Sequence, residues 1–137
     1  MFAPVVKHEE IRLLIKLAAI NGLHVSHYDI KTAFLYGDLE ETLYMEQPAG
    51  FIENPNLGCK LSKSIYGLKQ SLGCWNAKVD QTLKIQGFKQ AVADSCWSVK
   101  QNGQRLVFCV IYVGEILLIC KTEKRSEELE KHVEKYI

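Results

Sequence analysis

The stretch of sequence that decides the fold is Leu106–Cys120, which reads LVFCVIYVGEILLIC. It is apolar apart from Gly114 and Glu115 near its centre, and it is shorter than the roughly 20 residues that a membrane helix needs. Two apolar runs separated by a glycine predict a β-hairpin, with strands over 106–113 and 115–120 and a turn at Gly114-Glu115. A charge between such strands must lie at a tip that faces solvent or a site, and a plain exposed turn is the alternative.

The segments around this hairpin predict an α+β fold. Apolar residues at helical spacing predict helices over 7–21, 71–84 and 123–136. Further strands are predicted over 23–30, 42–46 and 95–100, and the proline- and glycine-containing stretch 47–58 is predicted to be a surface loop. Because strands and helices do not alternate regularly, we expect an antiparallel sheet backed by helices, in one domain over 1–137.

Composition limits the classes of function. The chain has 137 residues, 47% of them apolar, so it can bury a core. Its formal charge of +1 does not by itself indicate nucleic-acid binding, which would require a local basic patch. The five cysteines include no Cys-x-x-Cys pair, which favours reduced thiols in an intracellular protein. Neither a signal peptide nor a membrane span is predicted.

One carboxylate stands out at the end of a predicted strand. Asp29 lies in the sequence YDIKTAF, residues 28–34, and strand alternation places it on the same face as Val25 and His27. A carboxylate in a half-buried strand is costly unless it is paired or binds a metal, although a turn or N-cap role is the open alternative. Two-metal phosphoryl transfer needs such carboxylates in a cluster.

Three blocks of sequence then carry a resemblance to a known family. They are YDIKTAFLYG at 28–37, LSKSIYGLKQ at 61–70 and YVGE at 112–115, the last standing where the family has Tyr-Val-Asp-Asp. With Phe2–Val6 and Leu43–Pro48, they make the chain resemble the reverse transcriptase of copia-type long-terminal-repeat retrotransposons, a part of the Pol polyprotein. The resemblance implies a right-hand polymerase palm, an antiparallel sheet backed by helices, with partial fingers.

The resemblance also implies a metal site. Asp29 and the backbone carbonyl of Ile30 would bind Mg²⁺ (or Mn²⁺), ions that prefer oxygen ligands. Gly114 occupies the position of an essential carboxylate, which is therefore lost, and Glu115 keeps a charge on a side chain that is one methylene longer. Misplacing reacting groups by about 1 Å can cost on the order of 100-fold in rate. We therefore expect a degenerate catalytic site.

Nucleotide contacts are implied for three further residues. Phe34 would lie under the sugar and exclude a 2′-hydroxyl, Gln70 would contact the incoming nucleotide or the template, and Tyr112 would pack near the primer end. Ordinary core packing for Phe34 and a solvated helix terminus for Gln70 are the alternatives. Residues 71–73 read SLG where the family usually has Ala-Pro-Arg, so a positive charge near the phosphates is missing.

The implied function is RNA-directed DNA polymerisation, with primer–template nucleic acid and deoxynucleoside triphosphate as partners. We expect the thumb, RNase H and integrase domains to lie outside these residues. The alternatives are a non-catalytic module that binds nucleic acid or a protein partner, including a second copy of itself, and an inert remnant of a retroelement.

Overall fold

The computed structural model describes residues 5–92 and 94–136, without the side chain of Tyr136, so Phe2–Pro4 of the N-terminal block lie outside the described residues. The described helices are α1 (His8–Ile20), α2 (Ser71–Ile85), α3 (Glu123–Tyr136) and the short 3₁₀ helix η1 (Ala33–Tyr36). The main sheet contains β1 (His24–Asp29), β4 (Lys89–Gln90), β5 (Trp97–Asn102), β6 (Arg105–Tyr112) and β7 (Glu115–Cys120). Its strand order is β1-β7-β6-β5-β4, and each neighbouring pair is antiparallel. The predicted α+β class with an antiparallel sheet is confirmed.

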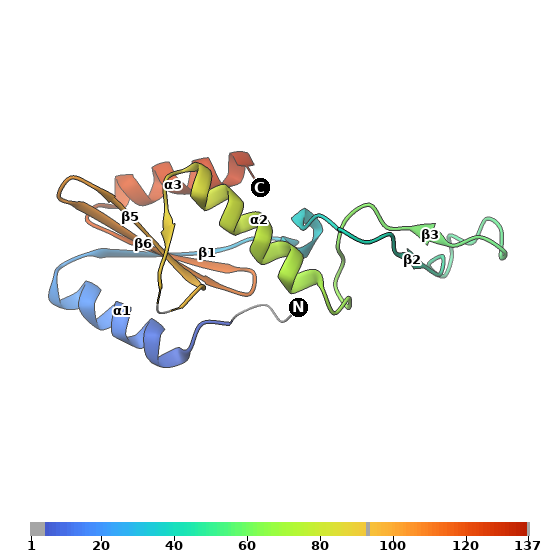
Figure 1. The fold of residues 1–137 in the computed structure, drawn as a ribbon, viewed down its shortest axis with the longest axis horizontal. Helices are drawn as coiled ribbons and strands as arrows, with labels where there is room; N and C mark the ends of the chain where they lie inside the picture. The colour runs from blue at the N-terminus through green and yellow to red at the C-terminus, as the bar shows by residue number, and fades with distance from the viewer. Residues whose placement is uncertain (1–4, 93, 137) are drawn as a thin grey trace.

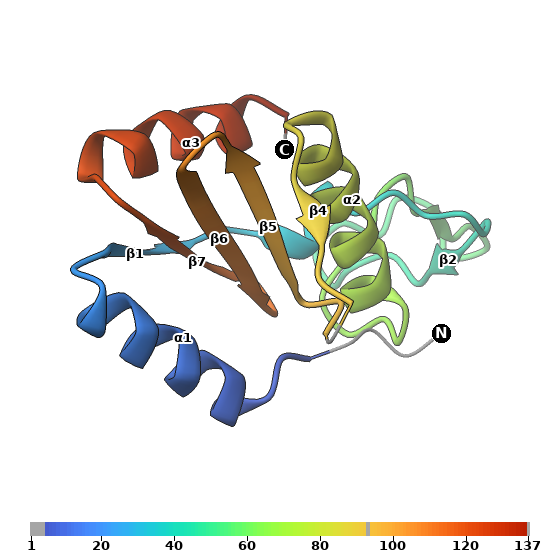
Figure 2. The ribbon, with the colours of Figure 1, turned by 60° about the vertical axis from the view of Figure 1, so that its left-hand side comes forward.

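Helices cover both faces of this sheet (Figures 1 and 2). On one face, Trp75, Val79 and Leu83 of α2 and Leu129 and Val133 of α3 join a core cluster with buried residues of β6 and β7. On the other face, α1 packs its buried residues in a second cluster. Because β6 and β7 are covered on both sides, they read as continuous apolar runs in the sequence.

The hairpin of β6 and β7 is confirmed, but its turn lies one residue earlier than expected. Tyr112 pairs with Glu115, which leaves Val113 and Gly114 as the two turn residues. Glu115 is therefore the first residue of β7, and the prediction that it belongs to the turn was wrong. Val113, not the glycine, takes the left-handed conformation, with φ 55°. Sequence rules place the left-handed residue of a hairpin turn at glycine, which here suggested a turn at Gly114-Glu115. The residue that takes this conformation is instead the β-branched Val113.

A two-stranded arm extends away from the body of the molecule (Figure 1). It consists of β2 (Tyr44–Met45) and β3 (Cys59–Lys60), joined by the predicted surface loop. The Gln47 side chain orders this loop, because its Nε2 donates to the carbonyls of Asn54 and Leu57, each at 2.6 Å. The loop is exposed but is held in a defined conformation.

The other predicted elements agree with the structure to within about two residues, as is usual for element bounds. The exceptions are the short elements η1, β3 and β4, which were not predicted from the sequence. The turn between β5 and β6 is Gly103-Gln104, because Asn102 pairs with Arg105. Within the described residues, none of the helices is both long and apolar enough to cross a membrane.

Candidate active site

The two predicted carboxylates face each other across neighbouring strands. Asp29 ends β1 and is the direct partner of Glu115, the first residue of β7. Directly opposed Cβ atoms lie about 4.5–5.5 Å apart, and like charges in such a pair repel each other. Both residues are exposed, and Nε2 of His27 lies 3.5 Å from the carboxylate of Glu115. The pair therefore forms a locally negative site with an imidazole beside it.

The loop after β1 is tied to the tip of the hairpin. The N–H of Ile30 donates to the carbonyl of Gly114 at 2.9 Å, and the carbonyl of Ile30 accepts from the N–H of Ala33 at 3.2 Å. A Cβ built on Gly114 would lie 3.4 Å from the Ala33 Cβ and 3.9 Å from the Ile30 carbonyl oxygen. These are ordinary van der Waals distances. The turn thus has room for a side chain at position 114, beside the carbonyl that the sequence analysis assigned to metal binding.

Trp75 of α2 makes a hydrogen bond to the backbone of the hairpin turn. It is fully buried, and its indole N–H donates to the carbonyl of Val113 at 2.5 Å. A left-handed conformation at a residue other than glycine costs roughly 1–3 kcal/mol and persists only where its surroundings impose it. The helical pattern over 71–84 did not indicate this role for Trp75. The available signal was that a buried indole N–H needs an acceptor.

The second family block docks onto η1 and positions Phe34. The Phe34 ring is half-buried against Tyr66, with 4.6 Å between the ring centroids. The buried hydroxyl of Ser64 donates to the Phe34 carbonyl, and its N–H donates to the Gly37 carbonyl at 3.0 Å. A Cβ on Gly37 would lie 2.8 Å from the Cys74 Cβ, so only glycine allows this close approach. Phe34 follows Ala33, the residue nearest to position 114.

Tyr112 and Gln70 differ in how they relate to the carboxylates. Tyr112 pairs with Glu115 from the side opposite Asp29, so these three residues form one row across β6, β7 and β1. The Tyr112 ring lies 6.0 Å from that of His8 in α1. Gln70 immediately precedes α2, its carbonyl accepts from the Cys74 N–H at 2.9 Å, and its side chain does not cap the helix. The structure does not bring Gln70 into the row.

Residues 1–137 match the family model described as "Reverse transcriptase (RNA-dependent DNA polymerase)". The chain belongs to this family. It is 42% identical over 124 residues to the Nicotiana tabacum "Retrovirus-related Pol polyprotein from transposon TNT 1-94", a match that covers 88% of the chain and 9% of that polyprotein. It is 38% identical over 119 residues to the corresponding polyprotein from transposon RE1 of Arabidopsis thaliana, covering 85% of the chain and 8% of the polyprotein. No solved structure shows significant similarity to it.

These relatives confirm the resemblance to copia-type retrotransposon Pol polyproteins. The similarity extends to the yeast Saccharomyces cerevisiae, whose "Transposon Ty1-BL Gag-Pol polyprotein" is 32% identical over 126 residues, which is 90% of this chain and 7% of that protein. The reverse transcriptase chain therefore spans less than a tenth of the length of these relatives.

Reverse transcriptases use divalent metal ions, so we compared the oxygen donors of this site with those that a two-metal site requires. Asp29 and Glu115 supply carboxylates, and the Ile30 carbonyl supplies an oxygen that already accepts one hydrogen bond. Within residues 5–92 and 94–136, no group of three or more His, Cys, Asp or Glu side chains could hold a metal ion. Two-metal sites place ions about 3.5–4 Å apart between shared carboxylates. The residues present do not fit such a site.

Proposed function

We propose that this chain is the palm, with part of the fingers, of a copia-type reverse transcriptase whose polymerase site is catalytically degenerate. The row of Asp29, Glu115 and Tyr112 supports a polymerase ancestry, because it occupies one end of an antiparallel sheet backed by helices. The observation that carries the proposal is the space at Gly114. A side chain fits there next to the Ile30 carbonyl, but glycine provides no carboxylate.

Under this proposal, the chain retains the parts that position substrates. Phe34 supports the sugar of the incoming deoxynucleotide, Tyr112 packs beside the primer end, and Gln70 contacts the nucleotide or the template. Primer–template nucleic acid and deoxynucleoside triphosphate are the ancestral partners, and Mg²⁺ or Mn²⁺ is the ancestral cofactor. The proposed setting is intracellular, as for retrotransposon replication.

The test is primer extension by the chain as written and by a Gly114→Asp/Glu115→Asp variant, in Mg²⁺ and in Mn²⁺. We expect no extension by the chain as written and measurable extension by the variant, because the substitution restores a carboxylate beside Ile30. A Gly114→Asn/Glu115→Gln variant is the control: Asn matches the size of Asp at position 114, Gln matches the size of the native Glu115, and neither position carries a carboxylate. Circular dichroism checks that all three proteins are folded.

Robust extension by the chain as written would refute the degeneracy. Extension by the Asn/Gln control would refute the role given to the carboxylate at position 114. If no protein extends the primer although all are folded, the two substitutions do not explain the loss, and the proposal in this form is wrong.

A non-catalytic binding module is the second candidate, and one observation favours it. Both core clusters are buried and continuous, while the donor set for metal chemistry is incomplete. Such a module would bind nucleic acid or a protein partner, or would self-associate. Titration with a labelled primer–template at low salt, where phosphate contacts are strongest, tests the nucleic-acid form. Absence of binding there would remove the nucleic-acid form, and a monomer in sedimentation would remove self-association.

A further inference from the structure

A second concentration of charge lies at the end of the sheet that is remote from Asp29 and Glu115. Arg105 begins β6, whereas Tyr112 ends it beside the candidate active site. At roughly 3.3 Å per strand residue, the two ends of β6 are about 23 Å apart. Two cavities of about 320 Å³ and 530 Å³ lie at this remote end, and they share Arg125 and Glu128 in their linings. Their sizes are within the range of small-molecule sites.

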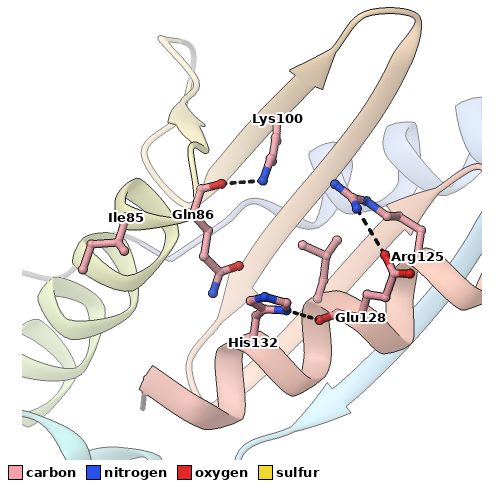
Figure 3. Close-up of a pocket in the computed structure, with 7 residues that line it drawn as sticks. Ile85, Gln86, Lys100, Arg125, Glu128 and His132 are labelled. Atoms are coloured by element: carbon pink, nitrogen blue, oxygen red, sulfur yellow. Dashed lines mark hydrogen bonds and ion pairs between the residues drawn. The ribbon is translucent and has the colours of Figure 1, made fainter.

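The smaller cavity contains a polar group without a partner. Both the Nε2 and the Oε1 atoms of Gln86 are buried, and neither has a hydrogen-bond partner among the described residues. Figure 3 shows the amide of Gln86 reaching from the end of α2 toward His132 of α3. Buried amides are normally paired, so this group offers one donor and one acceptor to a molecule in the cavity.

The two cavities together are strongly basic. We call this surface the basic end, defined by the cationic residues Lys100, Arg105, Lys121, Lys124 and Arg125 together with His132. Glu128 is the one carboxylate in the two linings, and it lies 3.2 Å from Nη1 of Arg125.

One of these cationic side chains is already hydrogen-bonded within the protein. The Lys100 ammonium donates to the Gln86 carbonyl at the end of α2. Arg105, Lys121 and Lys124 are exposed and have no ion pair among the described residues. They line the larger cavity beside the N-terminus of α3, where the helix dipole favours an anion and the carboxylate of Glu123 in the first turn opposes it. Together these charges favour a ligand that carries phosphate.

We propose that the basic end binds a nucleotide unit, with a base edge on the Gln86 amide and its phosphate on the side of Lys121 and Lys124. A glutamine amide matches the N6 donor and N7 acceptor of adenine, which makes an adenine nucleotide the preferred ligand. Arg125 lines both cavities and spans the base and phosphate subsites. The unit is either a free nucleotide or one nucleotide of a strand, and the two are distinguished by experiment.

The base subsite is tested by calorimetric titration of the full chain with AMP, ribose 5-phosphate and inorganic phosphate. We expect AMP to bind about 5- to 150-fold more tightly than ribose 5-phosphate, the range for one bidentate amide–base contact. Gln86→Met keeps the side-chain length but removes both hydrogen-bonding atoms, and it should abolish the difference. Equal affinities for AMP and ribose 5-phosphate in the wild-type chain, or a preference that survives Gln86→Met, would overturn the assignment of the base.

The phosphate subsite is tested with a labelled single-stranded oligoadenylate at several salt concentrations. Arg105→Gln/Lys121→Gln/Lys124→Gln should lower the slope of log K against log salt by about 0.7 if these side chains share one phosphate, and by about 2 if each contacts its own phosphate of the strand. The matched control, Arg12→Gln/Lys16→Gln/Lys89→Gln, makes the same change in net charge at exposed positions elsewhere.

The two ligands also identify the source of the nucleotide. Binding of AMP without the oligonucleotide assigns a free nucleotide, and binding of the oligonucleotide with the expected slopes assigns a strand. An equal loss in the control variant would show diffuse attraction in place of a site. Failure of the wild-type chain to bind either ligand at low salt would refute the proposal, whatever the outcome of the primer-extension experiment.

Discussion

The carboxylate missing at Gly114 can be detected through stability, independently of catalysis. We consider the Gly114→Asp/Glu115→Asp variant without primer or nucleotide, and we expect its unfolding temperature to depend on Mg²⁺ while that of the wild-type chain does not. The substitution is sterically allowed, since the new Cβ would lie 3.4 Å from the Ala33 Cβ. The change in stability should therefore be electrostatic.

The magnitude follows from the geometry of the site. In the absence of metal, a third carboxylate near Asp29 and residue 115 adds two repulsions, each about 0.7 kcal/mol at roughly 6 Å in water, so the variant should lose about 1–1.5 kcal/mol. At a free Mg²⁺ concentration ten times the dissociation constant, binding to the folded state restores about 1.4 kcal/mol. For a chain of 137 residues, that corresponds to a rise in Tm of about 5 °C.

Thermal unfolding followed by circular dichroism, with Mg²⁺ or with NaCl at equal ionic strength, measures this effect. The Gly114→Asn/Glu115→Gln variant controls for side-chain volume, and its Tm should not respond to Mg²⁺. Two results would refute the reasoning. One is an equal Mg²⁺-dependent shift in the wild-type chain, and the other is a folded double variant whose Tm is the same in Mg²⁺ and in NaCl.

Three further predictions concern the scaffold. Gly37→Ala should destabilise the chain by about 1–3 kcal/mol in urea unfolding, because the new Cβ overpacks the interface with α2. Gly73→Ala should instead stabilise α2, because nothing lies within 4 Å of its Cβ. Equal effects of the two substitutions on the free energy of unfolding would contradict this. Burial raises the pKa of the Cys109 thiol to about 12, so iodoacetamide should label it only after unfolding, as mass spectrometry of the native and urea-treated chain would show. The hydrogen bond from Lys63 lowers the pKa of the Asp38 carboxyl, so this pair contributes stability above the unfolded pKa of about 3.9 and loses it as pH falls through the folded pKa. Lys63→Gln should therefore be slightly less stable than wild type at pH 7 in urea titrations, and a gap that persists well below the folded pKa would contradict the assignment.

The long elements could be predicted from sequence because their patterns are local. The bounds of β7 and α3 match the predicted ranges, since a continuous apolar run and a polar helix with a narrow apolar stripe leave little ambiguity. The hairpin turn was displaced by one residue because Val113 takes the left-handed conformation that sequence rules reserve for glycine. Trp75, in another element, donates a hydrogen bond to the carbonyl of that residue, and a local pattern cannot show such a contact.

The sequence singled out residues for the candidate site but did not indicate how they lie relative to one another. Asp29 and Glu115 were singled out by strand position and by resemblance, and their direct pairing depends on a register between strands far apart in the chain. The docking of Ser64 onto η1 and the close approach at Gly37 likewise need the tertiary structure. The sequence did not single out Gln86, because what distinguishes it is a buried amide without a hydrogen-bond partner among the described residues of the folded chain.

The pairing of β1 with β7 also orders events during synthesis. β1 ends at Asp29 and is made long before its neighbour in the sheet, because β7 begins with Glu115. At roughly 5–20 residues per second, the interval between the two strands lasts on the order of 5–20 s. During that time, β1 has no strand to pair with, and the row that contains Asp29 cannot form. β1 is thus made first among the strands of this sheet and is paired late, so its exposed edge can pair with other chains until β7 is made.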